Sequence, residues 1–109
     1  ASIAAYNTTP QSAASLYSIT KRAIVRMSEA LAVEWSAKNI NVNAIAPGAF
    51  SSEMMDGMIE RVGYISQAFP RKRIGLPEQM DSTLLFLVSP SSECVTGTCI
   101  KIDDGQGSR

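Results

Sequence analysis

The sequence has no histidine, no net charge and no long apolar run, and each absence excludes a class of function. Without histidine the chain cannot build a histidine-based catalytic triad or most zinc sites, and we expect no metal site. Ten basic residues balance ten acidic residues, so no net field draws nucleic acid or an anionic membrane surface to the chain. No apolar stretch approaches the roughly 20 residues of a membrane span. Acid–base chemistry near neutral pH must therefore use a perturbed tyrosine, lysine or carboxylate.

Cysteine is also scarce, and the chain has no secretory features. It begins Ala1-Ser2-Ile3-Ala4-Ala5, which lacks the basic region of a signal peptide. The two cysteines, Cys94 and Cys99, lie near the end of the sequence. A disulfide between them is possible, but reduced thiols are favoured in a chain of this kind. We expect a cytoplasmic protein.

The composition is that of a folded domain. The 109 residues are 45% hydrophobic and 18% charged, which is typical of a globular chain and unlike a disordered one. The sequence contains no internal repeat, low-complexity tract or linker. We therefore expect residues 1–109 to form a single unit.

The first half of the chain reads as a loop, a helix and a strand. Residues 1–14 are small and polar, which indicates a loop. Apolar residues then recur at helical spacing from Ser15 to Lys38, and Asn39 is a plausible left-handed stop. The recurring positions are Ile24, Met27, Leu31 and Trp35. Small apolar residues widen this stripe, so we expect the helix to be covered on more than one side. The segment from Ile40 to Ala46 alternates like a strand, and a helix followed so closely by a strand is typical of an α/β crossover.

The second half of the chain again alternates predicted helices with a strand. A methionine-rich segment within residues 53–62 has the pattern of a short amphipathic helix, which could bind an apolar ligand or could simply pack on the surface. A helix is predicted from Pro77 to Val88 and a second strand from Thr98 to Ile102. The buried face of that helix is predicted to contain Met80, Leu84, Leu85, Leu87 and Val88. We expect the two strands to lie parallel, because a long crossover joins them.

Tyr17 and Lys21 lie four positions apart in the first predicted helix, so they share one face. A phenol is a weak acid at neutral pH, and a nearby positive charge favours its phenolate. Such a pair can exchange a proton with an alcohol or carbonyl oxygen. An isolated pair of this kind can equally be a half-buried aromatic residue beside a solvated charge.

Several motifs occur in an order that resembles the carboxyl-terminal half of a short-chain dehydrogenase/reductase. The resemblance covers nearly all of the chain. The motifs are Tyr17-Ser18-Ile19-Thr20-Lys21, Asn41-Val42-Asn43-Ala44-Ile45-Ala46-Pro47-Gly48, Arg73-Ile74-Gly75-Leu76-Pro77-Glu78, Val95-Thr96-Gly97 and Ile102-Asp103-Asp104-Gly105. The last departs from the family's common Asp-Gly-Gly. The resemblance implies an α/β fold, the carboxyl-terminal part of a Rossmann-type doubly wound parallel sheet, with about two parallel strands and three to four helices here.

The resemblance also implies roles for individual residues. Tyr17 matches the catalytic acid/base, and Lys21 matches the lysine that tunes it and holds the nicotinamide ribose. Ser2 matches the serine that orients the substrate, although its separation from Tyr17 is about two residues longer than usual. The turn beside the nicotinamide matches Pro47, Gly48, Phe50 and Ser52, and the substrate lid matches Met54, Met55 and Met58.

The function that the resemblance implies is NAD(P)-dependent hydride transfer between a carbonyl and an alcohol. The glycine-rich phosphate-binding loop of the family is absent from this sequence, so the choice between NAD and NADP cannot be read from it. We therefore expect a fragment that is inactive alone, and a small-molecule substrate for the parent protein. The alternative is a non-catalytic structural or oligomerisation module. Family members associate through the matching helix, so we expect a homo-oligomer, a dimer or tetramer.

Overall fold

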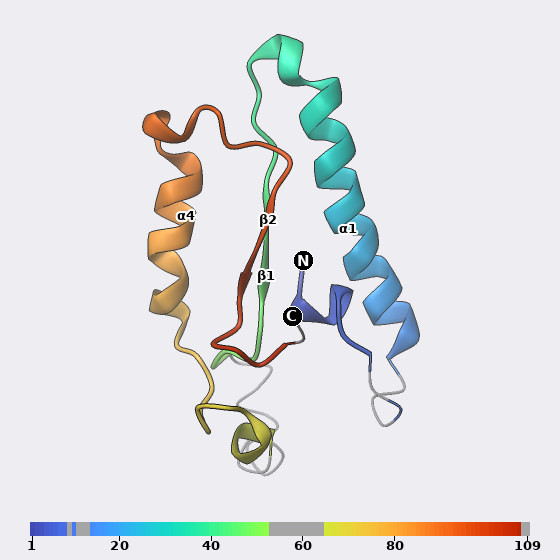
Figure 1. Cartoon of the computed structure of the whole chain (residues 1–109), viewed down its shortest axis with the longest axis vertical. Coiled ribbons are helices and arrows are strands. Elements are labelled where there is room, and N and C mark those ends of the chain that lie inside the picture. Colours follow the sequence, from blue (N-terminus) through green and yellow to red (C-terminus); the bar gives the residue numbers. More distant parts are fainter. Residues whose placement is uncertain (9, 11–13, 53–64, 108–109) are drawn as a thin grey trace.

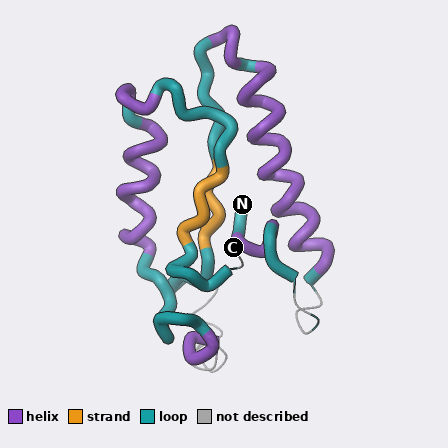
Figure 2. Tube along the Cα trace, viewed as in Figure 1, coloured by secondary structure: helices purple, strands orange, loops and turns teal. Residues whose placement is uncertain are grey.

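Two parallel strands lie between two helices in the computed structural model of the chain (Figure 1). The structure describes residues 1–8, 10, 14–52 and 65–107. Strand β1 (Ala44–Pro47) pairs with strand β2 (Cys99–Ile102), and Ala44 lies opposite Cys99 (Figure 2). Helix α1 (Ser15–Glu34) and helix α4 (Asp81–Val88) lie on opposite sides of this ribbon. The parallel pairing and the α/β class predicted from the sequence are confirmed.

Helix α1 begins where the sequence predicts and ends at Glu34, and its most buried residues lie beside the predicted apolar stripe. It is extended by the 3-10 helix Ser36–Lys38, and Asn39 stops it with a φ of 57°. The buried residues are Val25, Ser28 and Ala32, whereas Met27 is 53% exposed. The other predicted stripe residues, Ile24, Leu31 and Trp35, are half-buried, because small side chains rather than the largest apolar ones allow the closest approach. A Cβ added at Gly97 would lie only 3.2 Å from the Ala32 Cβ. Coverage on a second side is not seen in the described residues, where Leu16, Ile19 and Val33 are 74%, 64% and 78% exposed.

Strand β1 starts four residues later than predicted, because asparagine side chains replace the backbone ladder before Ala44. The Asn43 amide donates to the Val95 carbonyl oxygen at 2.8 Å and accepts from the Thr98 N–H at 3.1 Å. The Asn41 amide donates to the Glu93 carbonyl at 2.9 Å. Regular backbone pairing then begins at Ala44, whose N–H donates to the Thr98 carbonyl at 2.9 Å. The predicted second strand is confirmed to within one residue.

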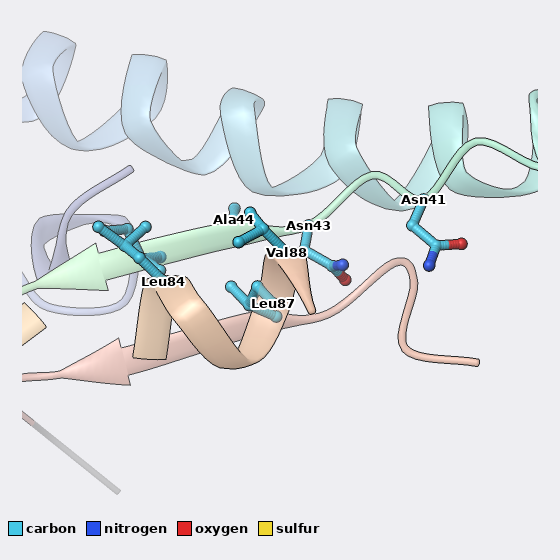
Figure 3. A pocket seen from close by; sticks show the side chains of 7 residues that line it. Asn41, Asn43, Ala44, Leu84, Leu87 and Val88 are labelled. Atoms are coloured by element: carbon cyan, nitrogen blue, oxygen red, sulfur yellow. The ribbon is translucent and has the colours of Figure 1, made fainter. Parts of the chain in front are cut away.

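The predicted helix from Pro77 to Val88 consists of the 3-10 helix Pro77–Met80 followed by α4. A further 3-10 helix, Pro90–Ser92, follows α4. The predicted buried face is wrong: Leu84, Leu85 and Val88 are 43%, 67% and 74% exposed. Only part of α4 lies against β1, and a hollow of about 280 Å³ remains between Leu84, Leu87 and Val88 on one side and residues 43–45 on the other (Figure 3). The outer side of α4 has no covering layer among the described residues.

Within the described part of the chain, no helix is long and apolar enough to cross a membrane. The same residues contain no cluster of three acidic or cysteine side chains able to hold a metal ion.

Candidate active site

Tyr17 and Lys21 lie in the first two turns of α1, on one face, as their spacing predicts. The Lys21 Nζ atom lies 5.2 Å from the centroid of the Tyr17 ring. Tyr17 is 48% exposed and Lys21 is half-buried. The helix therefore presents a phenol beside an ammonium group at a surface that a ligand can reach.

Ser2 is held next to the start of α1. Its backbone is extended, and it caps the 3-10 helix Ile3–Ala5 by accepting a hydrogen bond from the Ala4 N–H at 3.1 Å. The Ser18 hydroxyl donates to the Ala4 carbonyl oxygen at 2.7 Å, which ties this turn to the residue that follows Tyr17. The cap uses a lone pair of the Ser2 oxygen and leaves its O–H group as a donor. The turn that carries Ser2 is thus bonded directly to the helix that carries Tyr17 and Lys21.

Pro47 and Gly48 lie where β1 ends. The Gly48 N–H donates to the Ile102 carbonyl at 2.9 Å, which continues the pairing with β2 by one residue. A Cβ at Gly48 would collide with the Gln106 Oε1 atom and lie 3.0 Å from the Asp103 Cα. A residue larger than glycine therefore cannot occupy this position without moving the turn that follows β2.

Phe50 and Ser52 follow immediately. Phe50 pairs with Gly75 in an isolated parallel bridge, in which the Ser51 N–H donates to the Gly75 carbonyl at 2.8 Å. A Cβ at Gly75 would lie 2.5 Å from the Phe50 ring, so glycine is required there as well. Ser52 is exposed and is the last residue described before position 65. Met54, Met55 and Met58, the predicted substrate-lid residues, lie outside the described residues.

Two polar residues that the sequence did not single out hold this region together. The Gln106 Oε1 atom accepts from the Ala49 N–H at 2.6 Å. Asp104 accepts two hydrogen bonds from Arg73, from Nε at 2.7 Å and from Nη2 at 3.2 Å, and forms an ion pair with Arg71 at 3.1 Å. The Arg73 guanidinium holds the pKa of the Asp104 carboxyl below its usual range. The only sign of this role in the sequence is Asp104 itself, which stands where the family motif has glycine.

Tyr6 was also missed, because nothing in a loop sequence marks a residue that bridges two distant elements. The Arg22 guanidinium of α1 lies 4.9 Å from the centroid of the Tyr6 ring, and the Lys101 ammonium of β2 lies 4.3 Å from it. Burial raises the pKa of Tyr6 to about 12, and a side-chain hydrogen bond with Cys99 adds to the shift. Tyr6 thereby links the segment that carries Ser2 to both α1 and β2.

Known proteins resemble this chain along almost its whole length. A family model described as enoyl-(acyl carrier protein) reductase matches residues 1–106. The chain is 37% identical over 95 residues to a galactitol 2-dehydrogenase (L-tagatose-forming) of Cereibacter sphaeroides, covering 84% of this chain and 37% of that protein. It is 40% identical over 91 residues to an NAD-dependent glycerol dehydrogenase of Listeria innocua, covering 82% of this chain and 36% of that protein.

A solved structure shows the same likeness in three dimensions. The short-chain dehydrogenase/reductase SDR:Glucose/ribitol dehydrogenase of Brucella melitensis superposes with a TM-score of 0.85 and 33% identity, over 100% of this chain and 44% of that one. The chain spans little more than a third of the length of the galactitol and glycerol dehydrogenases that it matches.

Proposed function

Because the chain belongs to the short-chain dehydrogenase/reductase family, we propose that it forms the catalytic half of an NAD(P)-dependent oxidoreductase. The longer chain that we propose to contain these residues is called the full-length protein. The proposed reaction is hydride transfer between a small-molecule carbonyl and the corresponding alcohol, in a cytoplasmic protein. The observation that carries the proposal is the accessible Tyr17–Lys21 pair on α1.

Each residue of the site has a proposed task that its position supports. Tyr17 exchanges a proton with the substrate oxygen through its phenol oxygen, and Lys21 supplies a positive charge beside it. Ser2, whose O–H group is a donor, holds the same substrate oxygen. The three side chains come from two segments that are bonded to each other through Ser18, which supports their acting on one substrate oxygen.

The turn at the end of β1 fits the nicotinamide end of a dinucleotide. At Gly48 the missing Cβ leaves room for the Gln106 side chain, which holds the turn after Pro47, and Lys21, Phe50 and Ser52 supply a cation, a ring and a hydroxyl. When bound, the nicotinamide supplies or accepts the hydride. The residues that would hold the pyrophosphate are not in this sequence, so the chain's own contribution is to orient the reacting end.

The proposal is tested by following the hydride itself. The full-length protein is incubated with deuterium-labelled NAD(P)H and a panel of aldehydes, ketones and sugars, and the alcohol products are analysed by mass spectrometry. We expect one deuterium at the former carbonyl carbon of at least one product. Bound cofactor with no labelled product from any member of the panel would contradict the proposal.

We also propose that the protein associates as a homo-oligomer through its helices. Large apolar side chains stand exposed along α1, with Leu16 74% and Val33 78% exposed. Exposed apolar side chains of this size are typical of a subunit contact. It would serve either the enzyme or, if hydride transfer is absent, a non-catalytic oligomerisation module.

A further inference from the structure

Three short segments are bonded to one another where β1 and β2 end. Residues 49–51 follow β1, residues 73–75 precede Leu76, and residues 104–106 follow β2. The Gly75 N–H donates to the Ala49 carbonyl at 2.9 Å, and the Ser51 N–H returns a bond to the Gly75 carbonyl at 2.8 Å. The Gln106 side chain accepts from the Ala49 N–H at 2.6 Å and donates to the Ala49 carbonyl at 3.5 Å. Residues 49–51 are therefore held from two directions.

Asp104 links its own segment, residues 104–106, to residues 73–75, and these two segments hold residues 49–51. Its carboxylate accepts from Arg73 at 2.7 and 3.2 Å and lies 3.1 Å from the Arg71 Nη1 atom. Arg73 is two residues before Gly75, and Asp104 is two residues before Gln106. A loop of bonds is thereby closed through Ala49, Gly75, Arg73, Asp104 and Gln106. Bidentate arginine–carboxylate pairs fix orientation as well as distance.

Packing does not fill the space that these segments surround. A hollow of about 180 Å³ is lined by Phe50, Gly75, Gln79, Ile102, Asp104 and Gln106. Apolar contact across a hollow is weak, so the spacing of residues 104–106 from the other two segments depends on polar bonds. The Arg73–Asp104 pair is the only side-chain link between residues 73–75 and residues 104–106 that the described structure shows.

The backbone of Asp104 indicates that its carboxylate has a use. Asp104 has a φ of 51°, a left-handed conformation that glycine adopts at least cost and that aspartate and asparagine tolerate. The family motif that this segment resembles has glycine at this position, and glycine suits a left-handed turn. An aspartate adopts this backbone conformation less readily than glycine does, but it adds a carboxylate that pairs with two arginines.

We propose that Asp104 is a positioning residue for cofactor binding: it clamps residues 73–75 to residues 104–106 and thereby fixes the Ala49–Ser51 backbone beside the nicotinamide site. This inference rests on the proposed function, because that function places the nicotinamide next to Phe50 and Ser52. It adds a residue that touches neither substrate nor cofactor and acts through Arg73, Gly75 and Gln106.

The test compares Asp104→Asn with Glu29→Gln in the full-length protein. Asparagine keeps the size of the side chain and tolerates the left-handed backbone but loses the charge. Glu29→Gln is the matched control, because it removes the carboxylate of the exposed Arg26–Glu29 pair, 3.0 Å long, on α1. The rate of amide hydrogen exchange at Ala49, Ser51 and Gly75 measures how firmly these backbone groups are held. NAD(P)H titration and steady-state kinetics measure the effect on cofactor affinity and turnover.

We expect Asp104→Asn to speed exchange at those amides and to weaken NAD(P)H binding, each by about two- to fivefold, the range of a partly exposed ion pair. The turnover number at saturating cofactor should stay near that of the wild type, and the difference in affinity should shrink in about 1 M salt. Glu29→Gln should change none of these. If Asp104→Asn does not fold, Asp104→Gly replaces it, because glycine accepts the observed φ.

Unchanged exchange at the three amides would overturn the clamp. Faster exchange with unchanged NAD(P)H affinity would overturn the positioning role and leave Asp104 as a stability residue. A wild-type protein that binds no NAD(P)H would overturn the proposed function and the cofactor part of this inference together, while the exchange rates would still decide whether the clamp exists.

Discussion

At the scale of single residues, Tyr6 shows how a loop side chain gains a structural role. Two cations from different elements, Arg22 and Lys101, lie over its ring, and the charge of Arg22 by itself would favour the phenolate. Burial and the bond with Cys99 nevertheless raise the pKa of Tyr6 to about 12, because they favour the neutral phenol more strongly than Arg22 favours the anion. The protonated ring is therefore the form that the folded chain prefers.

This pKa shift predicts how stability depends on pH. The unfolded tyrosine titrates near pH 10, so the stabilisation from Tyr6 is complete below about pH 10 and is lost as pH rises toward 12. Absorbance titration should show one tyrosine ionising near 12, and Tyr6→Phe should remove that step and flatten the alkaline fall in stability. A single titration of all tyrosines near pH 10 would contradict this environment.

The residues that could be predicted from sequence were those whose role follows from local spacing. Tyr17 and Lys21 share a face because four residues make about one helical turn, and Asn39 stops a helix because it tolerates a positive φ. Asp104 and Gln106 could not be found in this way. Their partners lie 31 and 57 residues away, and only the folded chain brings them together.

At the scale of elements, the sequence predicted which segments are helical or extended better than it predicted which face is buried. Periodicity placed α1 and the two parallel strands. It did not place the start of β1, because the Asn41 and Asn43 side chains compete for carbonyl groups that a ladder would otherwise use. It also chose the large apolar residues of α1 as buried, whereas the close-packed side contains Ser28 and Ala32.

The helix that carries the proposed chemistry is bonded to the segment that precedes it. Helix α1 packs on the 3-10 helix Ile3–Ala5 through the Ser18 hydroxyl, and Tyr6 adds the contact with Arg22. The two linking residues of α1, Ser18 and Arg22, directly follow Tyr17 and Lys21 in the sequence. A rigid start of the helix is what a proton-transfer group requires, since catalytic geometry tolerates little displacement.

At the scale of the whole molecule, the core is thin. The buried apolar residues of the described chain are Ala5, Val25, Ala32, Ala44 and Ala46. None of the described large side chains is fully buried, and the radius of gyration is 15.4 Å, against about 13 Å for a compact domain of this size. Apolar area removed from water is the main source of folding free energy, so this arrangement gains little of it as a single chain.

We therefore predict that the 109-residue chain does not persist alone as a well-packed monomer. Light scattering should give a mass above 11.7 kDa, and the unfolding midpoint should rise with protein concentration. Ile19→Glu, on the exposed side of α1, should lower the measured mass, whereas Thr8→Glu at an exposed loop position should not. A monomeric mass together with cooperative unfolding that is independent of concentration would contradict this prediction.

The central claim, that the phenol oxygen of Tyr17 carries the proton in a hydride-transfer reaction, is tested most directly by the turnover of Tyr17→Phe in the full-length protein. The substitution removes one oxygen and keeps the ring, and Tyr6→Phe is its matched control. We predict that turnover falls by at least about a hundredfold, with NAD(P)H affinity largely preserved and the control near wild type. Near-normal turnover by Tyr17→Phe would remove Tyr17 from the mechanism and contradict the claim.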